Sequence, residues 1–296
     1  MASTLLSLIG NTPLVELPHL SPKKGIRIYA KLEGQNPSGS VKDRIVLAMV
    51  EEAERQGDLN PGSTIVEASS GNTAIALALV GKQRGYSIKV VIPQEVVPSV
   101  VDILELYGAE VIWCEPELGM KGAIDHARVL ARENGCYYLG QFNDRTNLEA
   151  HYITTGPEIA NALPEVDVFV AGIGTGGTIM GVGRRLQETN PHVRIIGVEP
   201  RLGERLQGLR SLAEGYIPPL LDLHRLHGRF LVDSATAIGA AREVINKEGI
   251  FAGVSSGATL PVALRVAERM DRGNIVVMFS DGGWKYLPAR PWDAAL

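Results

Sequence analysis

The sequence is poor in cysteine, has no strong excess of one charge and contains no long apolar run. Its 296 residues include two cysteines, Cys114 and Cys136, whose spacing matches neither a zinc site nor a disulfide framework, so we interpret both as buried thiols in a reducing compartment. The net charge of −4 argues against a broad basic surface for nucleic acid. The longest uncharged run, residues 168–183, contains six glycines, which indicates a turn region and not a membrane span.

What remains is the composition of an ordinary globular protein. Hydrophobic residues make up 45% and charged residues 21% of the chain, and the length is sufficient for two lobes. The first residues lack the basic-then-apolar pattern of a secretory signal, so we expect a cytoplasmic protein. His224 and His227 have helical spacing, but no third ligand lies nearby in the sequence, so we expect no metal site.

Strand-like and helix-like runs alternate along most of the chain. This alternation predicts βαβ units and parallel sheets, that is, an α/β fold. The irregular stretch 200–233 interrupts the pattern. The predicted strands are residues 12–17, 26–32, 64–68, 89–92, 110–113, 166–171, 194–198 and 274–279, and the predicted helices are residues 45–54, 74–83, 99–107, 120–133, 148–162, 179–188, 235–247 and 258–269.

A lysine lies at the start of the first predicted helix, in the run Asn-Pro-Ser-Gly-Ser-Val-Lys-Asp-Arg of residues 36–44. Ser40 is the predicted N-cap and Asp43 its capping partner, which places Lys42 in the first turn, where the helix dipole disfavours a cation. A lone lysine is most often a solvated surface side chain. A lysine whose charged form is disfavoured is also suited to forming a Schiff base.

Two loops have the composition of anion sites. Residues 69–73, Ser-Ser-Gly-Asn-Thr, lie between a predicted strand and helix, and they suit either a carboxylate or a simple helix cap. Gly172, Gly174 and Gly177 follow another strand and suit a phosphate. With Glu199 at the end of the next strand, these glycines also match the dinucleotide fingerprint, which on this segment alone is the better interpretation.

In combination, these motifs resemble those of the cysteine synthase and cystathionine β-synthase group of fold-type II pyridoxal-phosphate enzymes. The resemblance extends from Ile9-Gly10-Asn11-Thr12-Pro13-Leu14 to Gly283-Trp284. It implies two three-layer α/β/α lobes with the cofactor in the cleft between them, and typically a homodimer. The small, substrate-closing lobe would comprise residues 35–145, and the large lobe residues 1–34 and 146–296. A dinucleotide enzyme needs neither the Lys42 nor the Asn72 motif, so we reject that interpretation.

The resemblance also implies a role for each site residue. Lys42 would bind pyridoxal 5′-phosphate as a Schiff base and act as general base, Asn72 would bind the ring hydroxyl, and Ser255 the ring nitrogen. The cofactor phosphate would be held by Gly174, Thr175, Gly176, Gly177 and Thr178. The substrate carboxylate would be bound by Ser69, Ser70, Gly71, Thr73 and Gln141.

Three departures or additions bear on these roles. Ala74 stands where the family run continues with glycine, and Asn143-Asp144 where the family has Asn-Pro, so loop packing at both places is expected to differ. The segment around His151 also resembles the family, and we expect its role to be structural.

The implied reaction is a β-replacement that makes L-cysteine from an activated serine and a sulfur donor through an aminoacrylate. Residues 208–210, 214–218 and 283–287 resemble the branch called cysteine synthase M, whose acceptor is O-phosphoserine, and Arg210 would bind the substrate phosphate. Alternatives are O-acetylserine as acceptor, cystathionine β-synthase, serine or threonine dehydratase, and a cofactor-retaining binding module without catalysis. The sulfur donor stays open among sulfide, thiosulfate and a thiocarboxylated carrier protein.

Overall fold

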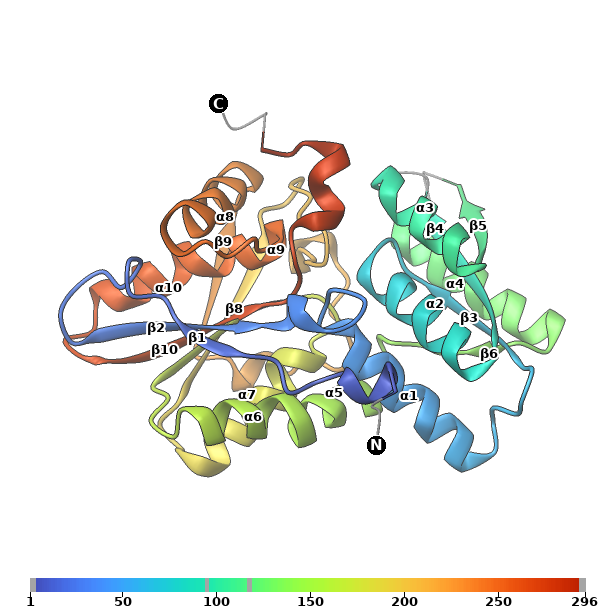
Figure 1. Ribbon diagram of the computed structural model, residues 1–296, viewed down its shortest axis with the longest axis horizontal. Helices are drawn as coiled ribbons and strands as arrows, with labels where there is room; N and C mark the ends of the chain where they lie inside the picture. Colours follow the sequence, from blue (N-terminus) through green and yellow to red (C-terminus); the bar gives the residue numbers. More distant parts are fainter. Residues whose placement is uncertain (1–3, 94–95, 116–118, 293–296) are drawn as a thin grey trace.

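The protein, described from a computed structural model over residues 4–93, 96–115 and 119–292, contains two β-sheets that lie side by side (Figure 1). Each sheet is covered by helices, as expected for two α/β/α lobes. We call the lobe around the larger sheet the large lobe and the other the small lobe. The strands are β1 (Leu14–Glu16), β2 (Ile26–Leu32), β3 (Thr64–Ala68), β4 (Ser87–Pro93), β5 (Glu110–Cys114), β6 (Tyr137–Tyr138), β7 (Val168–Gly172), β8 (Arg194–Pro200), β9 (Gly228–Val232) and β10 (Gly273–Phe279).

The large lobe contains a six-stranded sheet in the order β1-β2-β10-β7-β8-β9. Only the pairing of β1 with β2 is antiparallel, and the others are parallel. Side chains alternate between the two faces of β7: Val168 and Val170 join one buried cluster, whereas Phe169 and Ala171 join another. Burial on both faces explains why the central strands are continuously apolar.

The small lobe contains a four-stranded parallel sheet in the order β5-β4-β3-β6. Its two faces also bury different clusters, since Ile65 and Val90 lie on one side and Val66 and Val91 on the other. The strands run in the same direction, so the loops that follow β3 and β4 leave the sheet at one edge. That edge faces the large lobe (Figure 1).

Helices cover all four sheet faces. In the small lobe α1, α2 and α3 pack on one face and α4 on the other, while in the large lobe α6 and α7 oppose α8, α9 and α10. The helices are α1 (Lys42–Gln56), α2 (Asn72–Arg84), α3 (Pro98–Tyr107), α4 (Gly119–Asn134), α5 (Thr146–Ala150), α6 (Gly156–Ala162), α7 (Gly177–Thr189), α8 (Ser234–Glu248), α9 (Val254–Gly257) and α10 (Thr259–Glu268).

Three local expectations differ from the structure. The predicted helix 148–162 is interrupted by a π-helical turn, η4 (His151–Thr155), and a side chain at Gly181 of α7 would lie 2.8 Å from the His151 Cβ, so this turn packs closely on α7. The irregular stretch 200–233 contains the edge strand β9, whose single buried face lacks a strong apolar signal. The predicted cap is also wrong, because Ser40 is not the N-cap and the Asp43 carboxylate instead accepts hydrogen bonds from Ser38.

Candidate active site

The candidate active site lies where the carboxyl ends of β3, β7 and β10 meet the first turn of α1. Ligand sites in open α/β sheets occur at this edge. Two pockets that share Lys42, Asn72, Gly174 and Thr175 make up the cleft, which is lined by residues of both lobes. Of the predicted site residues, it includes Lys42, Ser69, Ser70, Gly71, Asn72, Thr73, Gln141, Gly174, Thr175, Gly176, Thr178, Arg210 and Ser255.

Lys42 is the first residue of α1, and the backbone just before it is attached at two points to the segment that follows β10. The Val41 N–H donates to the Ser280 carbonyl at 2.8 Å, and the Gly282 N–H donates to the Gly39 carbonyl at 3.2 Å. Burial, assisted by the positive charge of Lys285, lowers the pKa of Lys42 from 10.5 to about 8, although Asp281 acts in the opposite direction. A substantial fraction of neutral amine is therefore present near neutral pH, as nucleophilic or basic chemistry requires.

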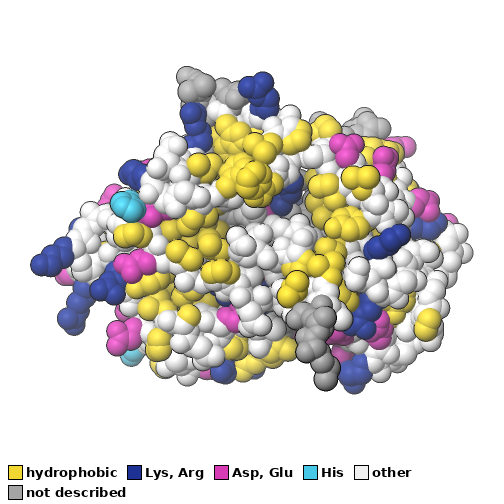
Figure 2. All heavy atoms as spheres, in the orientation of Figure 1, with side chains coloured by type: hydrophobic (Ala, Val, Ile, Leu, Met, Phe, Trp, Pro, Cys, Tyr) yellow, Lys and Arg dark blue, Asp and Glu magenta, His cyan; other side chains and the backbone are white. Residues whose placement is uncertain are grey.

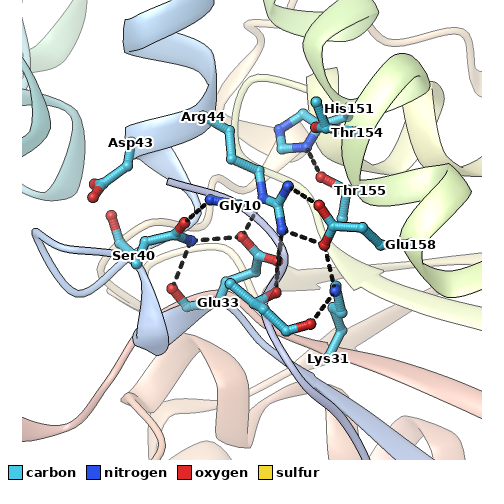
Figure 3. Close-up of polar contacts among 12 residues, drawn as sticks. Gly10, Lys31, Glu33, Ser40, Asp43, Arg44, His151, Thr154, Thr155 and Glu158 are labelled. Carbon is cyan, nitrogen blue, oxygen red and sulfur yellow. Dashed lines mark hydrogen bonds and ion pairs between the residues drawn. The ribbon is translucent and has the colours of Figure 1, made fainter. Parts of the chain in front are cut away.

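Arg44, two residues further along α1, forms the centre of a buried ionic network (Figure 3). Its guanidinium binds Glu33 at 2.7 and 2.9 Å and Glu158 at 2.7 Å through two nitrogens. Lys31 adds a second cation, 2.6 Å from Glu158. Two cations and two carboxylates balance one another, so the cluster avoids an uncompensated buried charge.

The network joins segments that are distant in the sequence. The Thr12 hydroxyl donates to Glu33, the Gly10 N–H donates to the Asn36 side chain, and the Asn11 N–H donates to Glu158. Strand β2, the loop before Lys42 and helix α6 thus meet at Arg44 (Figure 3). Hydrogen bonds from Arg44 and Lys31 outweigh the effect of burial and lower the pKa of Glu158 to about 2. The start of α1, and with it Lys42, is anchored to the large lobe by charge-assisted bonds.

The serine-rich loop 69–73 forms a polar pocket at the start of α2. The Ser69 hydroxyl accepts from the N–H groups of Gly71 and Ala74, so it caps the helix. The Thr73 hydroxyl donates to Gln141 Oε1 at 2.7 Å, and the Gln141 amide nitrogen donates to the Ala68 carbonyl at 3.3 Å. Gln141 lies in the cleft as expected, and in this structure it supports the loop itself.

Glu67, which sequence reasoning missed, lies directly beneath that loop. Its carboxylate accepts from the N–H groups of Gly140 and Gln141 at 2.6 and 3.3 Å, and its residue is fully buried. Burial raises the pKa of Glu67 to about 7, although these hydrogen bonds oppose the shift. The sequence signal that could have identified Glu67 is its position near the carboxyl end of β3, where ligand sites of α/β folds occur.

The glycine loop between β7 and α7 has the geometry of a phosphate cradle. Among the described residues, none accepts a hydrogen bond from the backbone N–H groups of Gly174, Thr175, Gly176 or Thr178. Gly176 has φ +88°, and a side chain at Gly174 would lie 2.6 Å from the Gly208 carbonyl. Free amides at a helix N-terminus suit a phosphate dianion, so these residues fit the phosphate group of the expected cofactor.

His151 is hydrogen-bonded to a residue of this phosphate cradle, Thr178. Its Nε2 is 3.0 Å from Thr178 Oγ1, and its Nδ1 is 2.9 Å from Thr155 Oγ1. Burial, together with the charges of Arg44 and Lys42, lowers the pKa of His151 well below its usual value, so the ring is neutral. The π-helical turn, with its extra residue, delivers this histidine to α7.

Asn72 and Ser255, expected at the ring hydroxyl and the ring nitrogen of the cofactor, share a buried partner. Asp281 Oδ2 accepts from Asn72 Nδ2 at 2.9 Å, and Asp281 Oδ1 accepts from the Ser255 hydroxyl at 3.3 Å. Lys285 and Tyr286 also bind this carboxylate, at 2.8 and 2.6 Å. Asp281 and Lys285 were missed by sequence reasoning, although they follow the carboxyl end of the last strand.

Arg210 lines the cleft and lies against two aromatic rings, Phe142 and Tyr216, that pack edge to face on each other. Its guanidinium carbon is 5.3 Å from the centre of the Phe142 ring and 5.1 Å from that of Tyr216. Burial lowers the pKa of Arg210 from its usual value, while the charge of Glu214 opposes the shift. No carboxylate of a described residue forms an ion pair with it, so its donors are available to an anionic ligand.

Comparison with known proteins shows to which family the chain belongs. Residues 5–281 match the family model described as pyridoxal-phosphate dependent enzyme. This chain belongs to that family. Cysteine synthase B of Salmonella typhimurium is 41% identical over 286 residues, covering 96% of this chain and 94% of the relative, and a cysteine synthase of Staphylococcus aureus is 40% identical over 293 residues, with the same two coverages. The predicted resemblance is thereby confirmed.

Solved structures of other members of the pyridoxal-phosphate dependent family superpose closely. An O-ureido-L-serine synthase has a TM-score of 0.94 at 36% identity and covers 100% of this chain and 96% of its own. The cysteine synthase of Entamoeba histolytica has a TM-score of 0.90 at 34% identity, covering 99% and 91%. The fold-type II architecture and pyridoxal phosphate as cofactor are therefore confirmed for this protein.

Two other features, a metal site and a membrane-spanning helix, are absent from the part of the chain that the structure describes. Within residues 4–93, 96–115 and 119–292, no cluster of three or more His, Cys, Asp or Glu side chains has the arrangement of a metal site. In the same ranges, no helix combines the length and the apolar character that crossing a bilayer requires.

Proposed function

We propose that this protein is a cysteine synthase that replaces the β-substituent of an activated serine with sulfur, and that O-phosphoserine is its preferred substrate. The names of the relatives support the class of reaction. The observation that carries the assignment is the position of Lys42, which lies in one cleft with Asn72, Ser255 and the 174–178 loop.

Each residue has a task in this proposal. Bound pyridoxal phosphate supplies an aldehyde for Lys42 and an electron sink that acidifies the α-carbon of the substrate amino acid. The 174–178 loop holds the phosphate through its free amides, Asn72 binds the ring hydroxyl and Ser255 binds the ring nitrogen. The neutral Lys42 amine takes the α-proton and later returns it. Residues 69–73, with Gln141 beneath them, bind the substrate carboxylate and limit access of water.

Arg210 supports the choice of O-phosphoserine over O-acetylserine. A phosphate dianion accepts two parallel hydrogen bonds from a guanidinium, whereas a neutral acetyl ester has no comparable acceptor pair. The Phe142 and Tyr216 rings hold the guanidinium in the cleft without neutralising it. The side chain is thus available to the leaving group.

The test compares kcat/KM for O-phosphoserine and O-acetylserine in the wild type and in Arg210→Ala. We expect the variant to lose about a hundredfold with O-phosphoserine and little with O-acetylserine, because a charge-assisted pair contributes about 1.5–3 kcal/mol. Arg201→Ala, an exposed arginine of the same stretch that pairs with Asp233, is the control. Equal losses with both substrates would refute the assignment of O-phosphoserine.

Further properties implied by the family belong to the same proposal. We infer a homodimer, a cytoplasmic location, a substrate-closing small lobe of residues 35–145, and sulfide, thiosulfate or a thiocarboxylated carrier protein as sulfur donor. Light scattering during gel filtration tests the oligomer and should yield twice the mass of the chain. Rates measured with each donor at equal O-phosphoserine concentration identify the donor.

A further inference from the structure

A second lysine, Lys285, lies in the cleft beside the proposed Schiff-base lysine. It belongs to η7 (Trp284–Ala289), the 3₁₀ helix after β10, and its side chain is only 9% exposed. Its Nζ is 2.8 Å from Asp281 Oδ2 and also donates to Asn72 Oδ1. Its carbonyl accepts from the Ser99 hydroxyl of α3 at 2.7 Å. Lys285 thus connects the large lobe to two elements of the small lobe.

The contacts of Lys285 determine which way the Asn72 amide points. An ammonium can only donate and a carboxylate can only accept. Lys285 therefore selects the amide oxygen, and Asp281, 2.9 Å away on the other side, selects the amide nitrogen. The reversed amide would direct N–H groups at the ammonium and oxygen at the carboxylate, which is unfavourable at both contacts.

In this orientation one of the two Nδ2 hydrogens of Asn72 has no acceptor among the residues that the structure describes. Of the two Nδ2 hydrogens, one is donated to Asp281, while Oδ1 is occupied by Lys285. Asn72 lines the same cleft as Lys42, Thr175 and Ser255. Towards a ligand in that cleft, the side chain therefore acts as a donor, as binding an electron-rich ring oxygen requires.

Lys285 and Asp281 also act on Lys42 through charge. Among the described residues, the carboxylates of Asp281 and Glu33 raise the pKa of Lys42, whereas the ammonium of Lys285 lowers it. Its positive charge offsets the carboxylates, which would otherwise hold a proton on the Lys42 amine. Removal of Lys285 would consequently favour the protonated, unreactive form.

We propose that Lys285 is a positioning residue for cofactor binding: paired with Asp281, it orients the Asn72 amide to donate to the ring hydroxyl of pyridoxal phosphate. This inference rests on the proposed function, since it takes Lys42 and Asn72 as the cofactor-binding residues. Asp281 also accepts from the Ser255 hydroxyl, so the residues proposed for the ring hydroxyl and the ring nitrogen share one buried carboxylate.

The experiment uses the full-length holoenzyme in the wild type and in Lys285→Met, Lys285→Arg and the double variant Asp281→Asn/Lys285→Met. The double variant removes both charges, so no buried carboxylate is left unpaired if the single variant folds poorly. Lys247→Met, whose surface ion pair with Glu243 is remote from the cleft, is the control. The readouts are the dissociation constant of pyridoxal phosphate and the ratio of visible to near-ultraviolet cofactor absorbance across pH.

We expect Lys285→Met and the double variant to bind the cofactor roughly tenfold more weakly, since a charge-assisted contact is lost. Their visible-band fraction should fall, because the ring oxygen loses an oriented donor. In Lys285→Met the pH midpoint of the visible band should also rise, while Lys285→Arg should restore most of the wild-type behaviour. Wild-type spectra and affinity in both Met variants would overturn the inference, as would equal losses in the Arg and Met variants.

Failure of the proposed function is recognised separately. Borohydride reduction and peptide mapping show which lysine carries the cofactor. If the label is absent from Lys42 in the wild type, the proposed function is refuted, whatever the spectra of the Lys285 variants show. A label on Lys42 together with spectra that do not respond to Lys285→Met refutes the positioning role alone.

Discussion

The Arg44 guanidinium and the Glu158 carboxylate form a two-point ion pair, with both nitrogen–oxygen distances 2.7 Å. This pair joins the first turn of α1 to α6 of the large lobe (Figure 3). Arg44 lies two residues after Lys42, so whatever displaces its side chain also disturbs the start of the helix that presents Lys42. The ion pair therefore helps to hold the start of α1, and with it Lys42, against the large lobe.

Arg44→Met is expected to destabilise the protein by about 3–5 kcal/mol, since breaking a buried ion pair leaves an unpaired charge behind. Here Glu33, whose side chain is fully buried, would lose its cation. Urea unfolding measures the change. Arg55→Met, which removes an exposed pair with Glu52, is the control and should change stability little. Equal midpoints for the two variants would contradict a structural role for the network.

Glu67 makes stability fall as pH rises. Its pKa is raised from 4.5 to about 7, so the folded protein binds this proton more tightly than the unfolded chain. The contribution is fully present below about pH 4.5 and is lost as pH rises through about 7, by an amount on the order of 3 kcal/mol.

Glu67→Gln should therefore flatten the decline in the free energy of unfolding between these pH values, measured by urea titration at each pH. Glu115→Gln, at an exposed position, is the control, and its free energy of unfolding should depend on pH as that of the wild type does. A Glu67→Gln profile parallel to the wild type would show that the carboxyl does not titrate in this range.

Glu158 makes stability change with pH in the direction opposite to that of Glu67. Its pKa is lowered from 4.5 to about 2, so its contribution to stability is present above about pH 4.5 and is lost as pH falls towards 2. We expect acid to weaken the Arg44 network, with a fall in the free energy of unfolding below pH 4.5 that Glu158→Gln reduces. Circular dichroism during acid titration measures it, and an unchanged acid limb in the variant would contradict the assignment.

His151→Ala should weaken the phosphate cradle. The hydroxyls of Thr155 and Thr178 both lose a partner, which costs about 1–3 kcal/mol for a buried group left unsatisfied. We expect weaker retention of pyridoxal phosphate on dialysis and a shifted ³¹P resonance of the bound cofactor. His224→Ala, at an exposed position, is the control. An unshifted resonance would limit His151 to packing.

Lys42→Ala should reduce β-replacement roughly a thousandfold or more, because it removes both the amine that binds the aldehyde and the general base. Borohydride should then fix no cofactor to the chain. Lys247→Ala should retain label and rate. A rate near that of the wild type in Lys42→Ala would place the chemistry on another residue.

Local patterns predicted most of the fold. Buried parallel strands such as residues 168–171 and 275–279 are continuous apolar runs, and the polar or glycine residues that flank them in the sequence mark their boundaries. Residues 228–232 escaped prediction because an edge strand buries one face only and its Arg229 pairs with Glu199 at 2.9 Å. The π-helical turn at His151 escaped because its cause, close packing against Gly181, lies 30 residues away.

The sequence by itself determined the alternation of strands and helices, the composition of the two loops proposed to bind anions, and the family, because each depends on neighbouring residues and on backbone chemistry that a short segment carries with it. Only the tertiary structure decided that Asp281 and Lys285 meet Asn72, that Arg44 is clamped between Glu33 and Glu158, and that Glu67 lies beneath Gln141. These pairs are as much as 213 residues apart, and burial and charge at such contacts arise only once the chain has brought them together.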